Sequence, residues 1–220
     1  MKKLGNAGLL GITRDPEYGG AGLDYSYSMV LFEELGHCMA GGVQTAIEVH
    51  TDMSTPAIAR FGSDYIKRNF LAPAIAGDAV SCVGISEISG GSDVAALKSY
   101  AKKDGDDYII NGSKMWISNG ATADWMCMLV NTSDGPVHKN KSIIVVPMKT
   151  KGVTVARKID KMGLRCSDTA EIYFDNVRVP TKNLVGEENM GFVYQMLQFQ
   201  DERICAAATG EFCLLVFVFI

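Results

Sequence analysis

Glu202 is the side chain whose neighbours in the sequence best suit acid–base chemistry. It lies in the string Gln200-Asp201-Glu202-Arg203, which Phe199 and Ile204 flank with apolar side chains. Burial among apolar neighbours raises the pKa of a carboxyl group towards the range that general bases use. A Glu–Arg pair on an exposed helix surface is the commoner meaning of such a string, so both interpretations stay open for the segment alone.

A serine- and glycine-rich turn is the second candidate. The segment reads Val83-Gly-Ile-Ser-Glu-Ile-Ser-Gly-Gly-Ser-Asp93 and leaves an expected strand. Glycine lets backbone N–H groups approach an anion or a ring edge, and serine hydroxyls donate to phosphate or to ring heteroatoms. Many surface turns share this composition, so a ligand-binding and a purely structural interpretation are equally supported.

Trp116 and Ser118 form the third candidate. Residues two apart in a strand point to the same face, so an indole plane and a hydroxyl donor could both meet one flat heterocycle. Taken by itself, the segment favours a different interpretation, in which Trp116 fills the core of a β-barrel.

Composition and spacing argue against several other classes of protein. The 220 residues include 21 basic and 25 acidic side chains, a net charge of −4, so no basic surplus is present to bind nucleic acid. The six cysteines form no C-x-x-C pair and are expected to be reduced thiols. The three histidines lack metal-ligand spacing; no metal is expected, and His50 is predicted to be a hydrogen-bonded core residue. No apolar window reaches the roughly 18 residues of a membrane span.

The elements that must position these residues begin with helices. Apolar residues recur at helical spacing up to about residue 78. We expect a first helix capped by Ser26 or Ser28, a second over residues 43–61 interrupted at Pro56, and a third from the N-cap Ser63 to about residue 76.

After residue 78 the pattern changes to short strands separated by turns, and Asp104-Gly-Asp106 and Asn111-Gly112 are predicted hairpin turns. The predicted strands are residues 79–85, 98–103, 108–110, 123–130, 142–147, 153–158 and 171–174. Helical spacing returns at residue 189, with one face carrying Phe192, Met196, Leu197 and Ile204. The fold class is therefore α+β with segregated layers.

The last residues do not fit this plan. Gly210 is expected to interrupt the final helix, and residues 212–220 are all apolar. Such a strip should be covered by another surface or promote association. Our interpretation is that the chain is truncated here.

Taken together and in order, these segments resemble the acyl-CoA dehydrogenase family over residues 9–210. Besides the turn at 83–93 and Trp116-Ile-Ser118, the motifs that carry the resemblance are Pro16-Glu-Tyr-Gly-Gly20, Phe32-Glu-Glu-Leu-Gly36, Phe61-Gly-Ser63, Met162-Gly-Leu-Arg-Cys-Ser-Asp168 and Phe174-Asp-Asn-Val-Arg-Val-Pro180.

The resemblance implies three units with FAD held between them. These are a partial N-terminal helical domain at 1–78, a middle β-barrel domain at 79–186 that forms the flavin and acyl-CoA wall, and the first helix of an incomplete C-terminal helical bundle at 187–220. The implied cofactor-binding residues are Val83, Gly84, Ile85, Ser86, Glu87, Ile88, Ser89, Gly90, Gly91, Ser92, Trp116, Ile117 and Ser118. The implied substrate-binding residues are Ser92, Gln200, Asp201, Glu202 and Arg203.

Glu202 takes the catalytic role in this resemblance. Most family members carry their catalytic glutamate far downstream, beyond residue 220. Isovaleryl and long-chain members carry it immediately before a helix arginine, the position of Glu202 beside Arg203. The implied reaction is α,β-dehydrogenation of an acyl-CoA thioester, with proton removal by Glu202, hydride transfer to FAD and electron transfer to electron-transferring flavoprotein. A homotetramer and a mitochondrial matrix location are also implied, with a cytoplasmic location as the alternative.

The sequence departs from the family pattern in two respects. Ile88 and Ser89 stand where the family usually has Pro-Gly, which changes the backbone of the flavin turn. The chain also resembles a family member truncated at both ends. Two alternatives follow: a catalytically inactive truncated form that acts only through protein–protein contacts, and a related flavoprotein oxidase.

Overall fold

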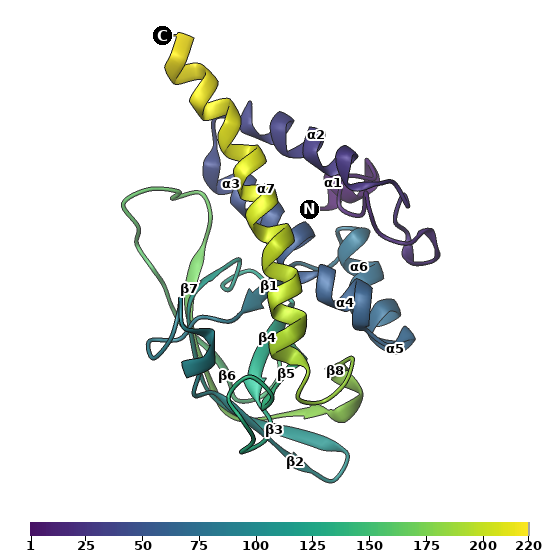
Figure 1. Cartoon of the computed structure of the whole chain (residues 1–220), viewed down its shortest axis with the longest axis vertical. Helices are drawn as coiled ribbons and strands as arrows, with labels where there is room; N and C mark the ends of the chain where they lie inside the picture. Colours follow the sequence, from purple (N-terminus) through teal and green to yellow (C-terminus); the bar gives the residue numbers. More distant parts are fainter. Residues whose placement is uncertain (220) are drawn as a thin grey trace.

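Helices and strands occupy opposite ends of the molecule, and one long helix joins them. The computed structural model describes the backbone of residues 1–219 and the side-chain surroundings of residues 1–210. Figure 1 shows the helices α1–α6 above and beside the sheet, with α7 running from the strands past α2 to the C-terminus. The predicted α+β class is confirmed, as is the order of a helical part, a β-part and a final helix.

The N-terminal helices are short and separated by turns. They are α1 (Lys2–Asn6), α2 (Tyr25–Gly36), α3 (Gly41–Glu48), α4 (Pro56–Phe61), α5 (Asp64–Ile66) and α6 (Ala72–Ile75), with a 3₁₀ turn at Pro16–Tyr18 and π-helical stretches at Val49–Ser54 and Lys67–Leu71. The Ser63 cap is confirmed, because its hydroxyl accepts from the Ile66 N–H at 3.3 Å. Neither Ser26 nor Ser28 caps α2. Asp24 does, accepting from the Ser26 N–H at 2.9 Å, because a carboxylate is as good a cap as a hydroxyl.

The predicted interruption at Pro56 is present, and side-chain hydroxyls shape the approach to it. Thr51, Ser54 and Thr55 each donate to the carbonyl four residues earlier, at 3.0, 3.0 and 2.6 Å. Such back-bonding competes with the regular helix ladder. Pro56 has no N–H to donate and begins the new helix α4.

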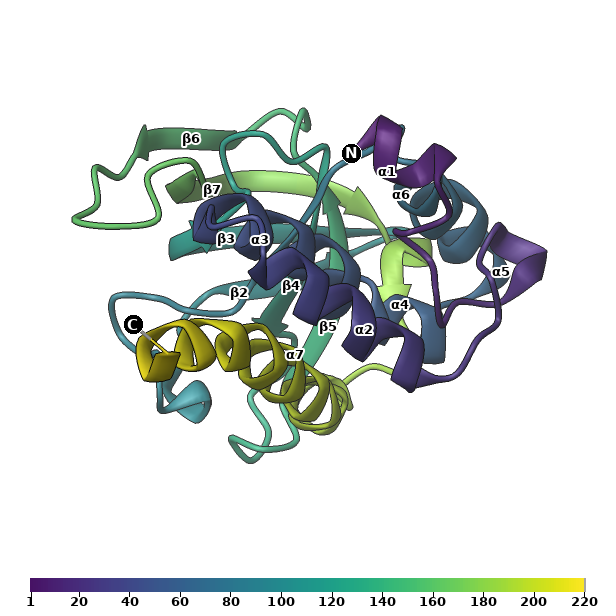
Figure 2. The ribbon, with the colours of Figure 1, turned by 90° about the horizontal axis from the view of Figure 1, so that it is seen from above.

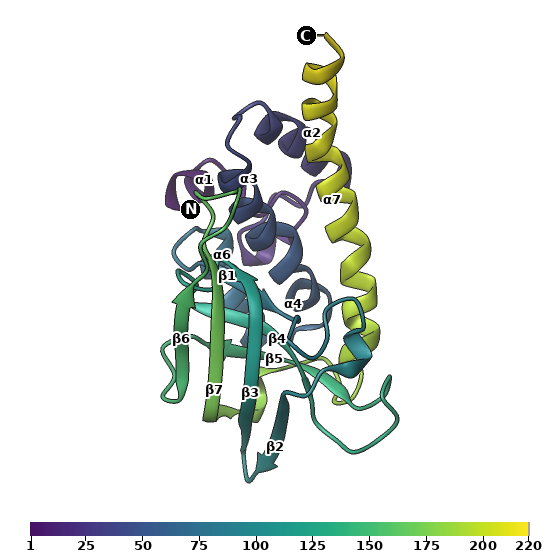
Figure 3. The same cartoon turned by 90° about the vertical axis from the view of Figure 1, so that its left-hand side faces the viewer.

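The strands form one sheet that curls over its own core. The strands are β1 (Ser81–Gly84), β2 (Tyr100–Asp104), β3 (Asp107–Ser118), β4 (Trp125–Asn131), β5 (Lys141–Pro147), β6 (Val153–Lys158), β7 (Thr169–Pro180) and β8 (Leu184–Val185), with 3₁₀ turns at Val94–Ala96 and Thr181–Asn183. Their order is β6-β7-β3-β2-β4-β5-β8, with β1 paired to β4. This order is an open path of paired strands, and Figure 3 shows β6, β7 and β3 side by side.

Strands β4 and β5 are buried on both faces, which explains their continuous apolar runs. One face, with Met126 and Ile144, packs inside the curled sheet against β3 and β7. The other face, with Trp125 and Val145, packs against the helices.

The predicted hairpin at Asp104–Asp106 is confirmed, with Asp104 paired to Asp107. The turn predicted at Asn111-Gly112 is wrong, because both residues lie inside β3, which is much longer than expected. Gly112 has φ 138° at a shift in register against β7, and Asn111 accepts from the Asn176 N–H at 2.9 Å. Asn111 alone lies opposite Asp175 and Asn176, so the extra residue of this β-bulge is on β7, and the Asn-Gly pair continues the strand instead of forming a turn.

The final helix α7 (Gly191–Phe219) also differs from the prediction, because it continues through Gly210. It contacts α2, the π-helical stretch at 49–54 and strands β4 and β5, and Figure 2 shows it beside α2. Its buried side carries Tyr194, Gln198 and Cys205, whereas Leu197 and Ile204 are exposed, contrary to the expected face. The side chains of the apolar segment 212–220 lie outside the described residues.

Candidate functional site

A cavity of about 170 Å³ lies where the helical part, the sheet and α7 meet. It is lined by Val49, Met53, Val83, Ile85, Ser86, Gly91, Trp116, Ile117, Ser118, Phe199 and Glu202. The three segments that the sequence singled out, the turn after β1, the end of β3 and the start of α7, therefore converge on one cavity.

The turn at 83–92 is held against β3 by a buried ion pair. The Lys114 ammonium group donates to Glu87 Oε1 at 2.8 Å and to the Ile85 carbonyl at 2.9 Å, and neither side chain of the pair is appreciably exposed. The other carboxylate oxygen of Glu87 accepts from the Lys98 N–H at 2.7 Å. Because the charges are paired and hydrogen-bonded, the pair tolerates burial and fixes the course of the turn.

The residues of this turn have different positions. Val83, Ile85, Ser86 and Gly91 line the cavity. Gly84 packs against Met126, and Glu87 and Gly90 are buried in the turn itself. Ile88, Ser89 and Ser92 are exposed and do not line the cavity.

Trp116 is not a core residue, since 55% of it is exposed. Its backbone is left-handed, with φ 60°, at a shift in register between Lys114 and Ile117 against β7. Simple alternation therefore does not hold, and Trp116, Ile117 and Ser118 all line the cavity. A left-handed tryptophan is strained, and such strain is typical of functional sites.

Glu202 provides the ionisable group of the cavity. Burial raises its pKa to about 7, while hydrogen bonds from the amides of Gln198 (3.2 Å) and Gln195 (3.4 Å) oppose the shift. The charge of Arg203 also lowers the pKa and that of Asp201 raises it. A carboxyl group that titrates near neutrality can accept a proton at physiological pH and release it again.

The remaining predicted substrate-binding residues do not converge on this cavity. Gln200 and Arg203 are exposed, and the guanidinium of Arg203 lies 5.7 Å from the centre of the Phe199 ring. Asp201 points elsewhere, to an ion pair with Arg60 at 2.7 Å. Neighbouring residues on a helix diverge by about 100°, so a run of four cannot share one cavity.

Sequence reasoning assigned no role at the site to Val49, Met53, Gln195 and Gln198, and it named Phe199 only as an apolar neighbour of Glu202. Val49 and Met53 are one helical turn apart, as are Gln198 and Glu202, so helical spacing was the available signal. Glutamines on an apolar helix face suggested no chemistry without a known neighbour.

His50 is the core residue that we predicted. Its Nε2 lies 3.0 Å from the Ala74 carbonyl, and its Nδ1 accepts from the Ser81 N–H at 3.1 Å. Among the described residues no group of three His, Cys, Asp or Glu side chains could hold a metal ion, and no helix there is long and apolar enough to cross a membrane. Within that part of the chain, Cys82, Cys127 and Cys205 are buried free thiols and Cys38 and Cys166 are exposed ones.

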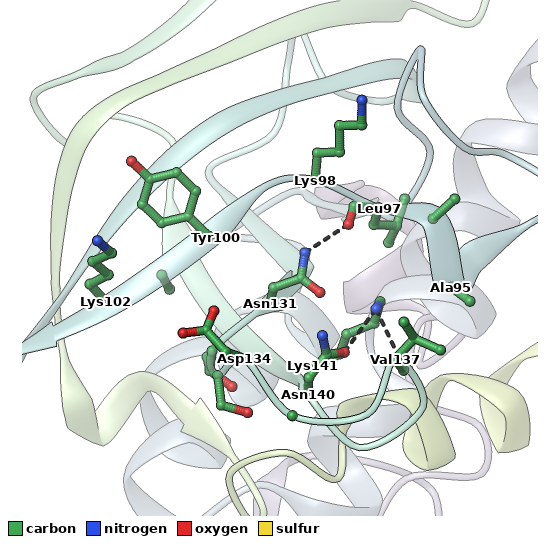
Figure 4. A pocket seen from close by; sticks show the side chains of 15 residues that line it. Ala95, Leu97, Lys98, Tyr100, Lys102, Asn131, Asp134, Val137, Asn140 and Lys141 are labelled. Carbon is green, nitrogen blue, oxygen red and sulfur yellow. Dashed lines mark hydrogen bonds between the residues drawn. The ribbon is translucent and has the colours of Figure 1, made fainter.

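A larger cavity, about 740 Å³, is a separate surface groove between the segment 95–102 and the loop 131–141 (Figure 4). The Lys141 ammonium group donates to Asn140 Oδ1 and to the Val137 carbonyl, both at 2.9 Å. None of the predicted site residues lines it, so the groove is not the place where the candidate chemistry converges.

The fold and the cavity define a helical domain packed on a β-domain, with a carboxylate on a following helix facing the β-domain. Family models for the N-terminal and middle domains of acyl-CoA dehydrogenases match residues 1–78 and 82–177. The chain belongs to the acyl-CoA dehydrogenase family.

Individual relatives agree with this assignment. A mitochondrial short-chain specific acyl-CoA dehydrogenase of Rattus norvegicus is 37% identical over 94% of this chain and 50% of its own length. A mitochondrial isovaleryl-CoA dehydrogenase of Pongo abelii is 35% identical over 94% and 49%. A crystal structure of an acyl-CoA dehydrogenase from Geobacillus kaustophilus has a TM-score of 0.91 and 38% identity over 96% and 56%. The chain thus spans about half the length of the relatives that it matches.

Proposed function

We propose that the chain contributes the active site of an FAD-dependent acyl-CoA dehydrogenase, which removes the α-proton and the β-hydrogen of an acyl-CoA thioester. The observation that carries the proposal is that Glu202 lines one cavity together with Trp116, Ser118 and the turn after β1. Family membership supports the reaction class.

The residues around the cavity fit a flavin. An exposed indole, a hydroxyl and a glycine backbone lie at one wall, and these groups can stack on and hydrogen-bond to a flat heterocycle. Trp116, Ile117, Ser118, Ser86 and Gly91 would hold the ring, with the remaining residues of 83–92 shaping the turn. FAD, when bound, would accept the hydrogen that leaves the β-carbon with its electron pair.

Glu202 acts as the general base. The carboxylate accepts the α-proton, and a pKa of about 7 keeps a substantial fraction of it charged at neutral pH. Val49, Met53 and Phe199 line the cavity with apolar surface, which excludes water and orients an acyl chain beside the carboxylate.

Glu202→Gln tests the proposal, because the amide keeps the size of the side chain and cannot take a proton. In flavin-loaded protein we expect the flavin absorption band to bleach on addition of acyl-CoA, and Glu202→Gln to abolish bleaching while acyl-CoA still binds. Exposed Glu187 provides the matched control Glu187→Gln. Bleaching that persists in Glu202→Gln would assign the base to another residue.

The substrate, the electron acceptor and the cellular location are proposed from family resemblance. The position of Glu202 before Arg203 favours an isovaleryl or long-chain substrate, and electron-transferring flavoprotein is the proposed acceptor. Acyl-CoA assays over a series of chain lengths and branches test the first, and reduction of the acceptor tests the second. The mitochondrial matrix is the proposed location, on the names of the mitochondrial relatives.

One observation favours the alternative of an inactive form that acts through protein contacts. Helix α7 exposes Val193, Leu197 and Ile204 by 43, 38 and 45%. Exposed apolar side chains at helical spacing are typical of a contact surface. Purified chain that binds no flavin and associates through this face would support the alternative.

A further inference from the structure

The side-chain amide of Gln198 occupies the break in the helical segment before Pro56. The Met53 carbonyl and the Ala57 N–H are four residues apart and would bond to each other in a continuous α-helix. Instead the Met53 carbonyl accepts from Nε2 of Gln198, and the Ala57 N–H donates to Oε1 of Gln198 at 3.2 Å. These two bonds to the Gln198 side chain, which is buried, replace the missing helical hydrogen bond.

The same amide reaches Glu202. Nε2 of Gln198 also donates to Glu202 Oε1 at 3.2 Å, so both of its hydrogens can be used. The Met53 carbonyl can only accept and the Ala57 N–H can only donate, so these two partners fix which end of the amide is nitrogen. The nitrogen therefore faces the carboxylate.

We infer that Gln198 is a positioning residue, which couples the carboxylate of Glu202 to the helix break whose residue Met53 lines the cavity. The inference rests on the proposed function only in describing Glu202 as the base. Three partners from three elements, the π-helical stretch at 49–54, α4 and α7, hold the amide, so Gln198 presents a fixed N–H to one carboxylate oxygen. The proton-accepting oxygen then keeps a set position relative to Met53.

The hydrogen bond also acts on the titration of Glu202. The ionisable groups that interact electrostatically with this carboxyl group are Asp201, Arg203 and Cys205 on α7 and Cys127 on β4. An N–H donor favours the charged carboxylate, so loss of Gln198 raises the pKa of Glu202. Gln195 donates to the same oxygen at 3.4 Å, but within the described part of the chain it makes no hydrogen bond to the helix break and its own Oε1 is unpaired.

Nuclear magnetic resonance of the 220-residue chain tests the inference without a variant. In wild-type protein the side-chain NH₂ signals of Gln198 should shift with pH, with the same midpoint as the titration of the Glu202 carboxyl carbon. The carboxyl signal of Glu202 is assigned by its loss in Glu202→Gln. The Ala57 amide should shift at the same midpoint, because the same side chain holds it. The side-chain NH₂ of exposed Gln200 should show no transition there.

A pair of variants gives the second measurement. Gln198→Met should raise the midpoint of Glu202 by about one pH unit, whereas Gln200→Met should leave it unchanged. The inference would be overturned if the Gln198 and Ala57 signals did not change as Glu202 titrates. It would also be overturned if the titration midpoint of Glu202 were unchanged in folded Gln198→Met. If Gln198→Met does not fold, the wild-type titration decides.

The two proposals fail differently. Flavin bleaching that survives Glu202→Gln removes the general-base role, whereas the coupling of Gln198 to the carboxyl group is measured without flavin or substrate. Conversely, a Gln198 signal that does not follow Glu202 leaves the base assignment in place and removes only the positioning role.

Discussion

Glu202 makes the stability of the folded chain depend on pH. The sign of this dependence follows from the direction in which the pKa of Glu202 is shifted. Burial raises its folded pKa from 4.5 to about 7, so between these values the folded chain keeps a proton that the unfolded chain has lost. The contribution of this group to stability is therefore fully present below about pH 4.5 and is lost as pH rises to about 7.

Glu202→Gln should remove this dependence. The free energy of unfolding of the variant, relative to wild type, should rise by roughly 2–3 kcal/mol between pH 4.5 and pH 8. Urea unfolding at a series of pH values measures the difference. Subtraction of the wild-type curve cancels the contributions of Glu48 and Asp52 to the pH dependence, since burial also raises the pKa values of these two groups. A difference that does not change with pH would mean that Glu202 titrates normally.

Lys114 and Glu87 show how a charged pair can stabilise a site from within the core. Lys114→Met leaves the Glu87 carboxylate buried without its cation, and we expect a loss of about 3–5 kcal/mol in the free energy of unfolding. Lys103 is exposed on β2 and provides the matched control Lys103→Met, which should change stability little. Equal effects of the two variants would show that the ion pair does not hold the turn.

At the scale of elements, β3 depends on a glycine beside the bulge of β7. A Cβ on Gly112 would lie 2.5 Å from Ser99 Oγ, and its φ of 138° is unfavourable for other residues. Gly112→Ala should therefore lower the free energy of unfolding by roughly 2–4 kcal/mol. Gly163, where a Cβ has open space and φ is not left-handed, gives the control Gly163→Ala. Chemical denaturation compares them, and a neutral Gly112→Ala would mean that the bulge relaxes easily.

The same strand shows what the sequence could predict about elements. Strands β4 and β5 were predicted to within two residues at each end, because long apolar runs are buried on both faces. The middle of β3 was missed, because Asn111-Gly112 has the composition of a turn and only pairing with β7 keeps it within the strand. Helix α7 was likewise predicted to be interrupted at Gly210, although one glycine lowers helix stability by only about 1 kcal/mol relative to alanine.

At the scale of the whole molecule, the spacing of apolar residues predicted the order of a helical part, a β-part and a final helix, and local patterns supplied Glu202, Trp116 and Ser118 as separate candidates. Their meeting in one cavity depends on the curl of the sheet and on the buried Glu87–Lys114 pair. The placement of Asp201 on Arg60 depends on the path of α7 over the helices. Contacts between residues this far apart in sequence follow from tertiary packing, which no local pattern contains.

The exposed face of α7 supports a prediction about assembly. Burying Leu197 and Ile204 against the same face of a second chain removes apolar surface from water, and one patch that meets its own copy gives a two-fold dimer. We expect sedimentation velocity to show a concentration-dependent dimer.

Leu197→Glu combined with Ile204→Glu should shift this dimer towards monomer, because two carboxylates would face two others across the axis. Lys139→Glu, at an exposed loop position, makes the same change in net charge and should leave the dimer intact. A dimer that resists the double substitution would place the contact on another surface, and a monomeric wild type would show that this face alone does not drive association.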